Sequence, residues 1–224
     1  MITLHHLEYS QSFRILWLLE ELGVPYDLKI YERDPKSRLA PDEYKALSPL
    51  GTAPVITDES GLVLAESNAV IDHILDAHPE SSLRPAPGEA SRVDYLFWFH
   101  AGVGSLMPMQ FFNGLLTMMT NRSPALVRPI IGKATGAVRD MLVAPRLRLL
   151  FDKLENDLGR NTWLAGENLT AADISMCYSM ASAEAQGRLK DRPNCQRWME
   201  QMRATPSFQR AMEKDGRETF VFSG

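Results

Sequence analysis

The first thirty residues switch between two hydrophobic periodicities. Residues 2–7 form a short apolar run typical of a buried strand, whereas residues 10–22 repeat apolar side chains at helical spacing. Gly23 ends that helix, and residues 26–31 alternate apolar and polar side chains as a second strand does. A helix between two such strands predicts a β-α-β unit with parallel strands.

A second group of short elements completes the first half of the chain. Residues 43–47 predict a brief helix, residues 54–57 a strand, and residues 62–64 an antiparallel strand that follows a glycine-containing turn. Ser67 opens a further helix with apolar side chains on one face. The resulting order, β-α-β-α-β-β-α, predicts a thioredoxin-like α/β domain over residues 1–80.

The rest of the chain has a different pattern. Residues 81–91 are rich in Pro, Gly and Ser, which is typical of an exposed linker. Beyond it, residues 92–224 show helical periodicity and no strand pattern, so we expect an all-α C-terminal domain. The predicted helices of this domain cover residues 94–119, 139–158, 171–186, 195–204 and 207–214.

Composition narrows the choice of function. The 224 residues are 45% hydrophobic, enough to build two cores. Lys and Arg number 24 against 28 Asp and Glu, a formal net charge of −4. This balance lacks the basic footprint of a nucleic-acid-binding protein.

Cysteine usage and hydropathy indicate a cytoplasmic protein. Cys177 and Cys195 are too few for a disulfide framework and lack metal-ligand spacing. We find no signal-peptide pattern and no apolar run near 18 residues. Residues 138–158 have an apolar face, but acidic residues interleave with the basic ones, so we expect no stable membrane association.

Pro54 stands at the start of a predicted strand, where a proline needs a special role. We expect a cis Ala53-Pro54 bond that turns the backbone of Val55 toward a ligand, so that an extended peptide pairs with it as an added strand. A trans proline at a strand start is the structural alternative.

Glu66 and Ser67 lie where the last strand meets the next helix. Ser67 can cap that helix, or the helix N-terminus can hold a carboxylate while Glu66 binds an ammonium group. The second arrangement suits the head group of an amino acid.

Tyr9, Ser10 and Ser12 place three hydroxyls at the first strand-to-helix turn, where α/β folds gather ligands. For Ser12 we favour a structural role as a cap of the helix. A Ser10 hydroxyl that donates to a thiolate at the helix N-terminus would favour the ionised form. Lowering a thiol pKa from about 8.5 to below 7 requires about 2 kcal/mol, which one hydrogen bond and a helix dipole can supply.

Three segments together resemble the cytosolic glutathione transferases, in particular the bacterial and fungal branch that activates the thiol with Ser. They are Ser10-Gln11-Ser12-Phe13-Arg14, Pro49-Leu50-Gly51-Thr52-Ala53-Pro54-Val55-Ile56 and Ala65-Glu66-Ser67-Asn68-Ala69-Val70-Ile71. Residues 166–174 resemble the folding motif of the family's helical domain, and Thr170 with Asp173 has capping-box spacing. The phenol of Tyr-using members aligns with His6, so Tyr9 is the reserve candidate behind Ser10.

The resemblance implies an enzyme that conjugates glutathione, as co-substrate, to hydrophobic electrophiles in detoxification. Glutathione would contact the six residues Ser12, Ala53, Pro54, Val55, Glu66 and Ser67. The family's electrophile pocket corresponds to the helix after the linker, with Phe97, His100, Met107 and Phe111 as candidates.

Other readings share this signature. Glutathione-dependent peroxide reduction would use the same thiolate, and a non-catalytic glutathione-binding stress protein would keep the binding residues alone. The five histidines show no metal-ligand pair, so we expect no metal. The resemblance also implies a homodimer. The identity of the electrophile does not follow from the motifs.

Overall fold

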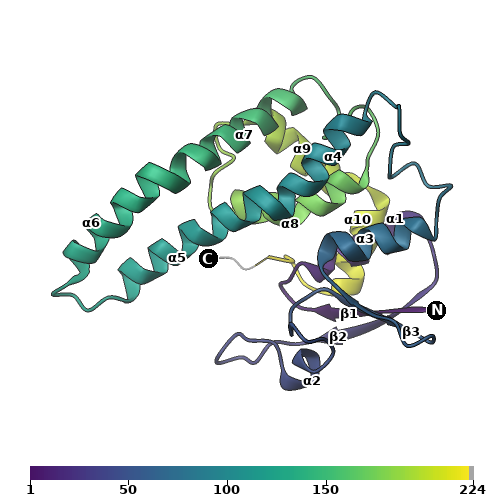
Figure 1. The fold of residues 1–224 in the computed structure, drawn as a ribbon, viewed down its shortest axis with the longest axis horizontal. Helices are drawn as coiled ribbons and strands as arrows, with labels where there is room; N and C mark the ends of the chain where they lie inside the picture. The colour runs from purple at the N-terminus through teal and green to yellow at the C-terminus, as the bar shows by residue number, and fades with distance from the viewer. Residues whose placement is uncertain (222–224) are drawn as a thin grey trace.

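The computed structural model describes residues 1–221 (Figure 1). Its N-terminal part contains a mixed four-stranded sheet with strand order β2-β1-β3-β4. The strands are β1 (Ile2–Leu7), β2 (Tyr26–Tyr31), β3 (Val55–Asp58) and β4 (Val63–Ala65). β1 pairs with β2 in parallel and with β3 in antiparallel orientation, as the thioredoxin-like order requires.

Helices cover both faces of this sheet. α1 (Ser12–Leu22) and α3 (Ser67–Asp76) lie between the sheet and the helical domain, and the short α2 (Asp42–Lys45) lies on the other side (Figure 1). Successive residues of a strand face opposite sides, so Leu4 packs toward α1 whereas Leu7, three residues on, joins Tyr44 of α2 in a separate small cluster.

In the C-terminal part the regular elements of the described residues are all helices, apart from one isolated bridge between Trp163 and Gly166. Its elements are α4 (Arg92–Ala101), the π-helical turn η1 (Gly102–Leu106), α5 (Met107–Arg122), α6 (Arg128–Val138), the π-helical turn η2 (Arg139–Val143), α7 (Ala144–Leu158), α8 (Ala171–Ala185), α9 (Pro193–Ala204) and α10 (Pro206–Asp215). α5 and α6 form a long hairpin that projects from the body of the molecule (Figure 1).

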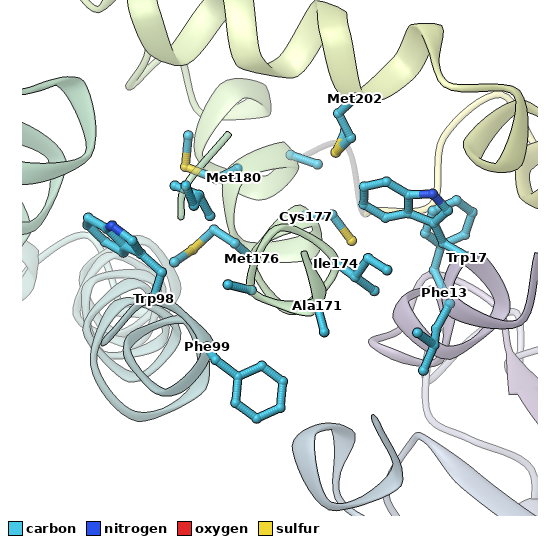
Figure 2. Packing of buried hydrophobic residues seen from close by; sticks show 14 of the residues in the cluster. Phe13, Trp17, Trp98, Phe99, Ala171, Ile174, Met176, Cys177, Met180 and Met202 are labelled. Atoms are coloured by element: carbon cyan, nitrogen blue, oxygen red, sulfur yellow. The ribbon is translucent and has the colours of Figure 1, made fainter. Parts of the chain in front are cut away.

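α8 is the centre of the hydrophobic core. Figure 2 shows its residues between Trp17 of α1 on one side and Trp98 of α4 on the other. Both indoles are fully buried, and their N–H groups donate to Ser207 and Asp157. One continuous cluster of buried residues therefore joins the two parts of the chain.

The capping box expected from Thr170 and Asp173 starts α8. The Asp173 carboxylate accepts hydrogen bonds from the Thr170 amide at 2.9 Å and from the Thr170 hydroxyl at 3.0 Å. It also accepts from the Leu164 amide and the Trp198 indole, and it is fully buried. The motif thus fixes the central helix and the chain that leads into it.

One detail of the helical domain differs from expectation. The helix expected to begin at residue 139 continues backward through η2 into α6, which begins at Arg128. Pro108 is the second residue of α5, just after η1. No helix in residues 1–221 is long and apolar enough to cross a membrane.

Candidate functional site

A tight turn joins β1 to α1 and holds the candidate nucleophile-activating residues. Tyr9 has a φ of 49°, a left-handed conformation that is uncommon for a residue with a side chain. The Tyr178 hydroxyl donates a 3.1 Å hydrogen bond to the Tyr9 carbonyl, which fixes the turn from α8. The next residue, Ser10, therefore has a defined position at the N-terminus of α1.

Ser10 is held by its own hydrogen bonds. Its Oγ donates to the Leu7 carbonyl at 2.7 Å and accepts from the Ser12 amide at 3.2 Å. The side chain is largely buried, yet Ser10 lines a cavity together with Tyr9. Ser12 is fully buried and bonds within the protein, so it lies behind Ser10 and not on the cavity wall where we expected a ligand contact.

The cavity at this turn, called the first cavity below, has a volume of about 630 Å³. Two cationic residues, Arg33 and Lys45, line it, and burial lowers the pKa of Arg33. Its full lining is Leu7, Tyr9, Ser10, Gln11, Arg33, Leu39, Ala40, Lys45, Pro49, Leu50, Gly51, Thr52, Ala53 and Tyr178. The polar and cationic wall suits a ligand with carboxylate groups. Neither cation stood out in the sequence, because isolated surface charges carry no motif.

The Ala53-Pro54 bond is cis, as expected. The residue that reaches the cavity, however, is Ala53. Val55 is fully buried and pairs on both sides, with His5 of β1 and Ala65 of β4. Its position inside the sheet does not fit the ligand contact that we expected of it, and Ala53 is the better placed backbone.

Glu66 and Ser67 lie at the start of α3. Glu66 is exposed and has a φ of 76°, and Ser67 is the first helical residue, so Ser67 is not the cap. The Ser67 hydroxyl donates to the Gln11 side-chain oxygen at 3.2 Å, and Gln11 accepts a second bond from Arg14 at 2.6 Å. Neither Glu66 nor Ser67 is part of the first cavity's wall, and Gln11 connects Ser67 to that wall.

A second cavity of about 690 Å³ adjoins the first and is mostly apolar. Met107 and Phe111 line it, as expected, whereas Phe97 and His100 do not. Phe97 packs against Trp98 under the Lys153 ammonium, and His100 is exposed. The lining is Gln11, Met107, Pro108, Gln110, Phe111, Phe112, Gly114, Leu115, Met118, Tyr178, Ser179, Ser182 and Gln186.

Gln11 and Tyr178 line both cavities. Neither residue was predicted from the sequence as part of the site. Tyr178 belongs to α8, which is buried on nearly all sides, so its hydrophobic pattern does not distinguish a cavity-lining residue. The described residues hold no group of three or more His, Cys, Asp or Glu arranged for a metal ion. The site thus consists of the polar first cavity and the apolar second cavity, which meet at the turn that contains Tyr9, Ser10 and Gln11.

Known proteins match the chain over nearly its whole length. Family models match residues 10–77 as "Glutathione S-transferase, N-terminal domain" and residues 118–206 as "Glutathione S-transferase, C-terminal domain". Glutathione S-transferase 3 of Schizosaccharomyces pombe is 35% identical over 217 residues, which cover 96% of this chain and 88% of the relative.

Solved structures agree. A glutathione S-transferase from Actinobacillus pleuropneumoniae is 35% identical, with a TM-score of 0.78 and coverage of 96% of this chain and 93% of that one. A glutathione transferase homologue from Sulfitobacter with bound glutathione is 18% identical, with a TM-score of 0.74 and coverage of 96% and 98%, and shows the fold alone. The sequence, the fold and the relatives agree, and the chain belongs to the glutathione S-transferase family.

Proposed function

We propose that this transferase binds glutathione in the first cavity, ionises its thiol beside Ser10 and transfers the thiolate to an apolar electrophile in the second cavity. The shared wall carries the proposal: Gln11 and Tyr178 line both cavities, so a thiol near Ser10 would lie at the boundary between them. Proximity of the two reactants is a large part of the rate gain in bimolecular reactions.

The charges of the site support glutathione as the ligand. Glutathione carries two carboxylates and one ammonium group, and the first cavity supplies Arg33 and Lys45 for a carboxylate. Glu66 would hold the ammonium, and the N-terminus of α3 at Ser67 the carboxylate beside it. The backbone of Ala53 would pair with the extended peptide.

Ser10 is the hydroxyl that we assign to the thiolate, and Tyr9 is the alternative. Ser10 lines the cavity at the N-terminus of α1, whose dipole favours an anion. The hydroxyl would leave the Leu7 carbonyl and donate to sulfur. Peroxide reduction and conjugation share this step, whereas a non-catalytic binding protein would lack it.

Thiolate absorbance with glutathione tests the assignment. Ser10→Ala should raise the pKa of the bound thiol and lower turnover about 100-fold at neutral pH, with glutathione affinity nearly intact. Tyr9→Phe should have the smaller effect. A reversed order would assign the activation to Tyr9, and no thiolate band in the wild-type protein would contradict the proposed function. A panel of electrophiles and peroxides then separates conjugation from peroxide reduction.

We also propose a homodimer that works in a reducing compartment such as the cytoplasm. Cys177 and Cys195 are both buried and unbridged, and burial raises the pKa of each thiol to about 12. Such thiols are inert and do not compete with glutathione for electrophiles.

A further inference from the structure

A chain of buried hydrogen bonds runs from Ser10 to the last helix. Ser10 Oγ lies 2.8 Å from Ser12 Oγ, which lies 2.8 Å from His6 Nδ1. On the far side of the ring, His6 Nε2 lies 2.6 Å from Asp215 Oδ1. The His6 and Asp215 side chains are 1% and 0% exposed. Four groups from β1, the turn, α1 and α10 thus form one path closed to solvent behind the cavity.

The direction of each bond follows from the donors available. A carboxylate only accepts, so His6 Nε2–H donates to Asp215. In a singly protonated ring Nδ1 is then an acceptor, and the Ser12 hydroxyl donates to it. Ser12 Oγ accepts from the Leu7 amide at 3.1 Å, which leaves one lone pair for the Ser10 hydroxyl. The Ser10 hydroxyl donates to the Leu7 carbonyl at 2.7 Å and reaches this lone pair by turning toward Ser12 Oγ, 2.8 Å away. With that turn the path is oriented from Ser10 toward His6.

We propose that this path carries the thiol proton of glutathione to His6. The S–H bond breaks and its proton goes to Ser10 Oγ, the Ser10 proton goes to Ser12 Oγ, and the Ser12 proton goes to His6 Nδ1. The products are a thiolate at Ser10 and an imidazolium paired with Asp215, so atoms and charge balance without another reactant. This inference rests on the proposed function and adds the group that receives the thiol proton.

The surroundings suit an imidazolium at this position. Asp215 compensates the new charge directly, as a buried cation requires. Arg217 Nη1 lies 3.5 Å from the same carboxylate oxygen, but its Nε also pairs with Glu8 at 3.0 Å. Within residues 1–221 the second carboxylate oxygen, Oδ2, is buried and accepts no hydrogen bond. Part of the Asp215 charge is therefore uncompensated by hydrogen bonds before the ring becomes charged.

His6 therefore acts through the two serines as a proton acceptor and never touches the substrate. The arrangement follows the logic of a hydroxyl, an imidazole and an orienting carboxylate, with one additional hydroxyl between. It also makes the first cavity depend on α10, because Asp215 is the residue with which that helix ends.

Proton counting tests the relay. Glutathione is mixed with the enzyme at pH 7 in weak buffer with an indicator dye, and thiolate absorbance is recorded in the same experiment. We expect the wild-type enzyme to form thiolate with almost no proton released to solvent. His6→Gln keeps an acceptor for Ser12 and a donor for Asp215 but has no basic nitrogen. It should release about one proton per thiolate and lower turnover at pH 7 by about 10-fold or more.

Two further variants keep the test decisive. Ser12→Ala interrupts the path while leaving the His6–Asp215 pair, and should behave as His6→Gln does, even if that variant does not fold. Ser207→Ala removes another buried bond between α1 and α10, the one to Trp17, and should behave as the wild type. One proton released per thiolate in the wild type overturns the relay alone. Absence of thiolate overturns the proposed function, and the relay with it.

Discussion

The Tyr178 hydroxyl and the Tyr9 carbonyl, 169 residues apart in the chain, form a 3.1 Å hydrogen bond. Tyr178 belongs to the central helix α8 and Tyr9 to the turn that presents Ser10. The same phenol lines both cavities. The helical domain therefore supplies a wall of both cavities and also a support for the turn that presents Ser10.

Removing this hydroxyl should weaken the turn. Tyr178→Phe loses one neutral hydrogen bond, a cost of about 0.5 to 1.5 kcal/mol, so kcat/KM should fall about two- to tenfold. Tyr95→Phe is the matched control, because within residues 1–221 the buried Tyr95 hydroxyl has no hydrogen-bond partner. Steady-state kinetics of both variants check the expectation. Equal activity of Tyr178→Phe and the wild type would mean that the turn holds its shape unaided.

Glutathione affinity should depend on the start of α3. Glu66→Ala and Ser67→Ala each remove a group that we assign to the γ-glutamyl head group, and a lost charge-assisted bond costs roughly 1.5 to 3 kcal/mol. Calorimetric titration measures the change, with the exposed Ser60→Ala as control. Both variants should remain folded. If both bind glutathione as the wild type does, the carboxylate site is not at α3.

The apolar surface of α4 predicts a dimer. Val93 is 74% exposed, and Leu96 and Phe97 are exposed on the same helix. Light scattering at micromolar concentration should give twice the 25.2 kDa of one chain. Val93→Asp should shift the mass toward the monomer, whereas Ile30→Asp, on the edge strand β2, should not. A wild-type mass near 25.2 kDa would refute the assignment.

Stability should depend on the ionisation of Glu20. Burial alone would raise the pKa of this carboxyl, but hydrogen bonds from Lys214, Tyr26 and Arg210 outweigh it and lower the pKa below the ordinary value. A lowered pKa stabilises the fold above the ordinary glutamate value of about 4.3, and the contribution is lost as the pH falls through the lowered value.

Glu20→Gln tests this directly. Two of the partners are half exposed, so the free energy of unfolding should fall by only about 1 to 2 kcal/mol at pH 7. Urea denaturation at pH 7, 4 and 3 should show the difference from the wild type shrinking only below the ordinary glutamate value of about 4.3. Glu213→Gln, which changes an exposed carboxylate on α10 beside Lys214, should be neutral at each pH. A difference that stays constant with pH would assign the effect to packing.

Local patterns predicted most of the fold. The strands and the helices around them follow from hydrophobic spacing. The Thr170–Asp173 capping box could be predicted because its two residues are three positions apart in the sequence. α6 was missed. Gly132, Thr135 and Gly136 lower its helix propensity, and its contacts with α5 stabilise it instead.

The residues that line the second cavity were harder to predict, because they depend on which face of the helix each side chain occupies. Phe97 and His100 precede the π-helical turn η1, and Met107 and Phe111 follow it. A turn closed over five residues instead of four rotates the face of the helix that follows. The family resemblance assigned all four side chains to one pocket without regard to this rotation, and only the last two line it.

The position of α10 limits how this protein can be cut or recombined. α10 is the last helix within residues 1–221, yet its Phe208 packs edge-on against Phe13 and Trp17 of α1. A fragment that ends in the linker would expose two aromatic side chains that are now fully covered. We therefore expect the thioredoxin-like half to need α10 in order to fold stably. A chimera that keeps this half should also include α10, although more than a hundred residues separate the two in the sequence.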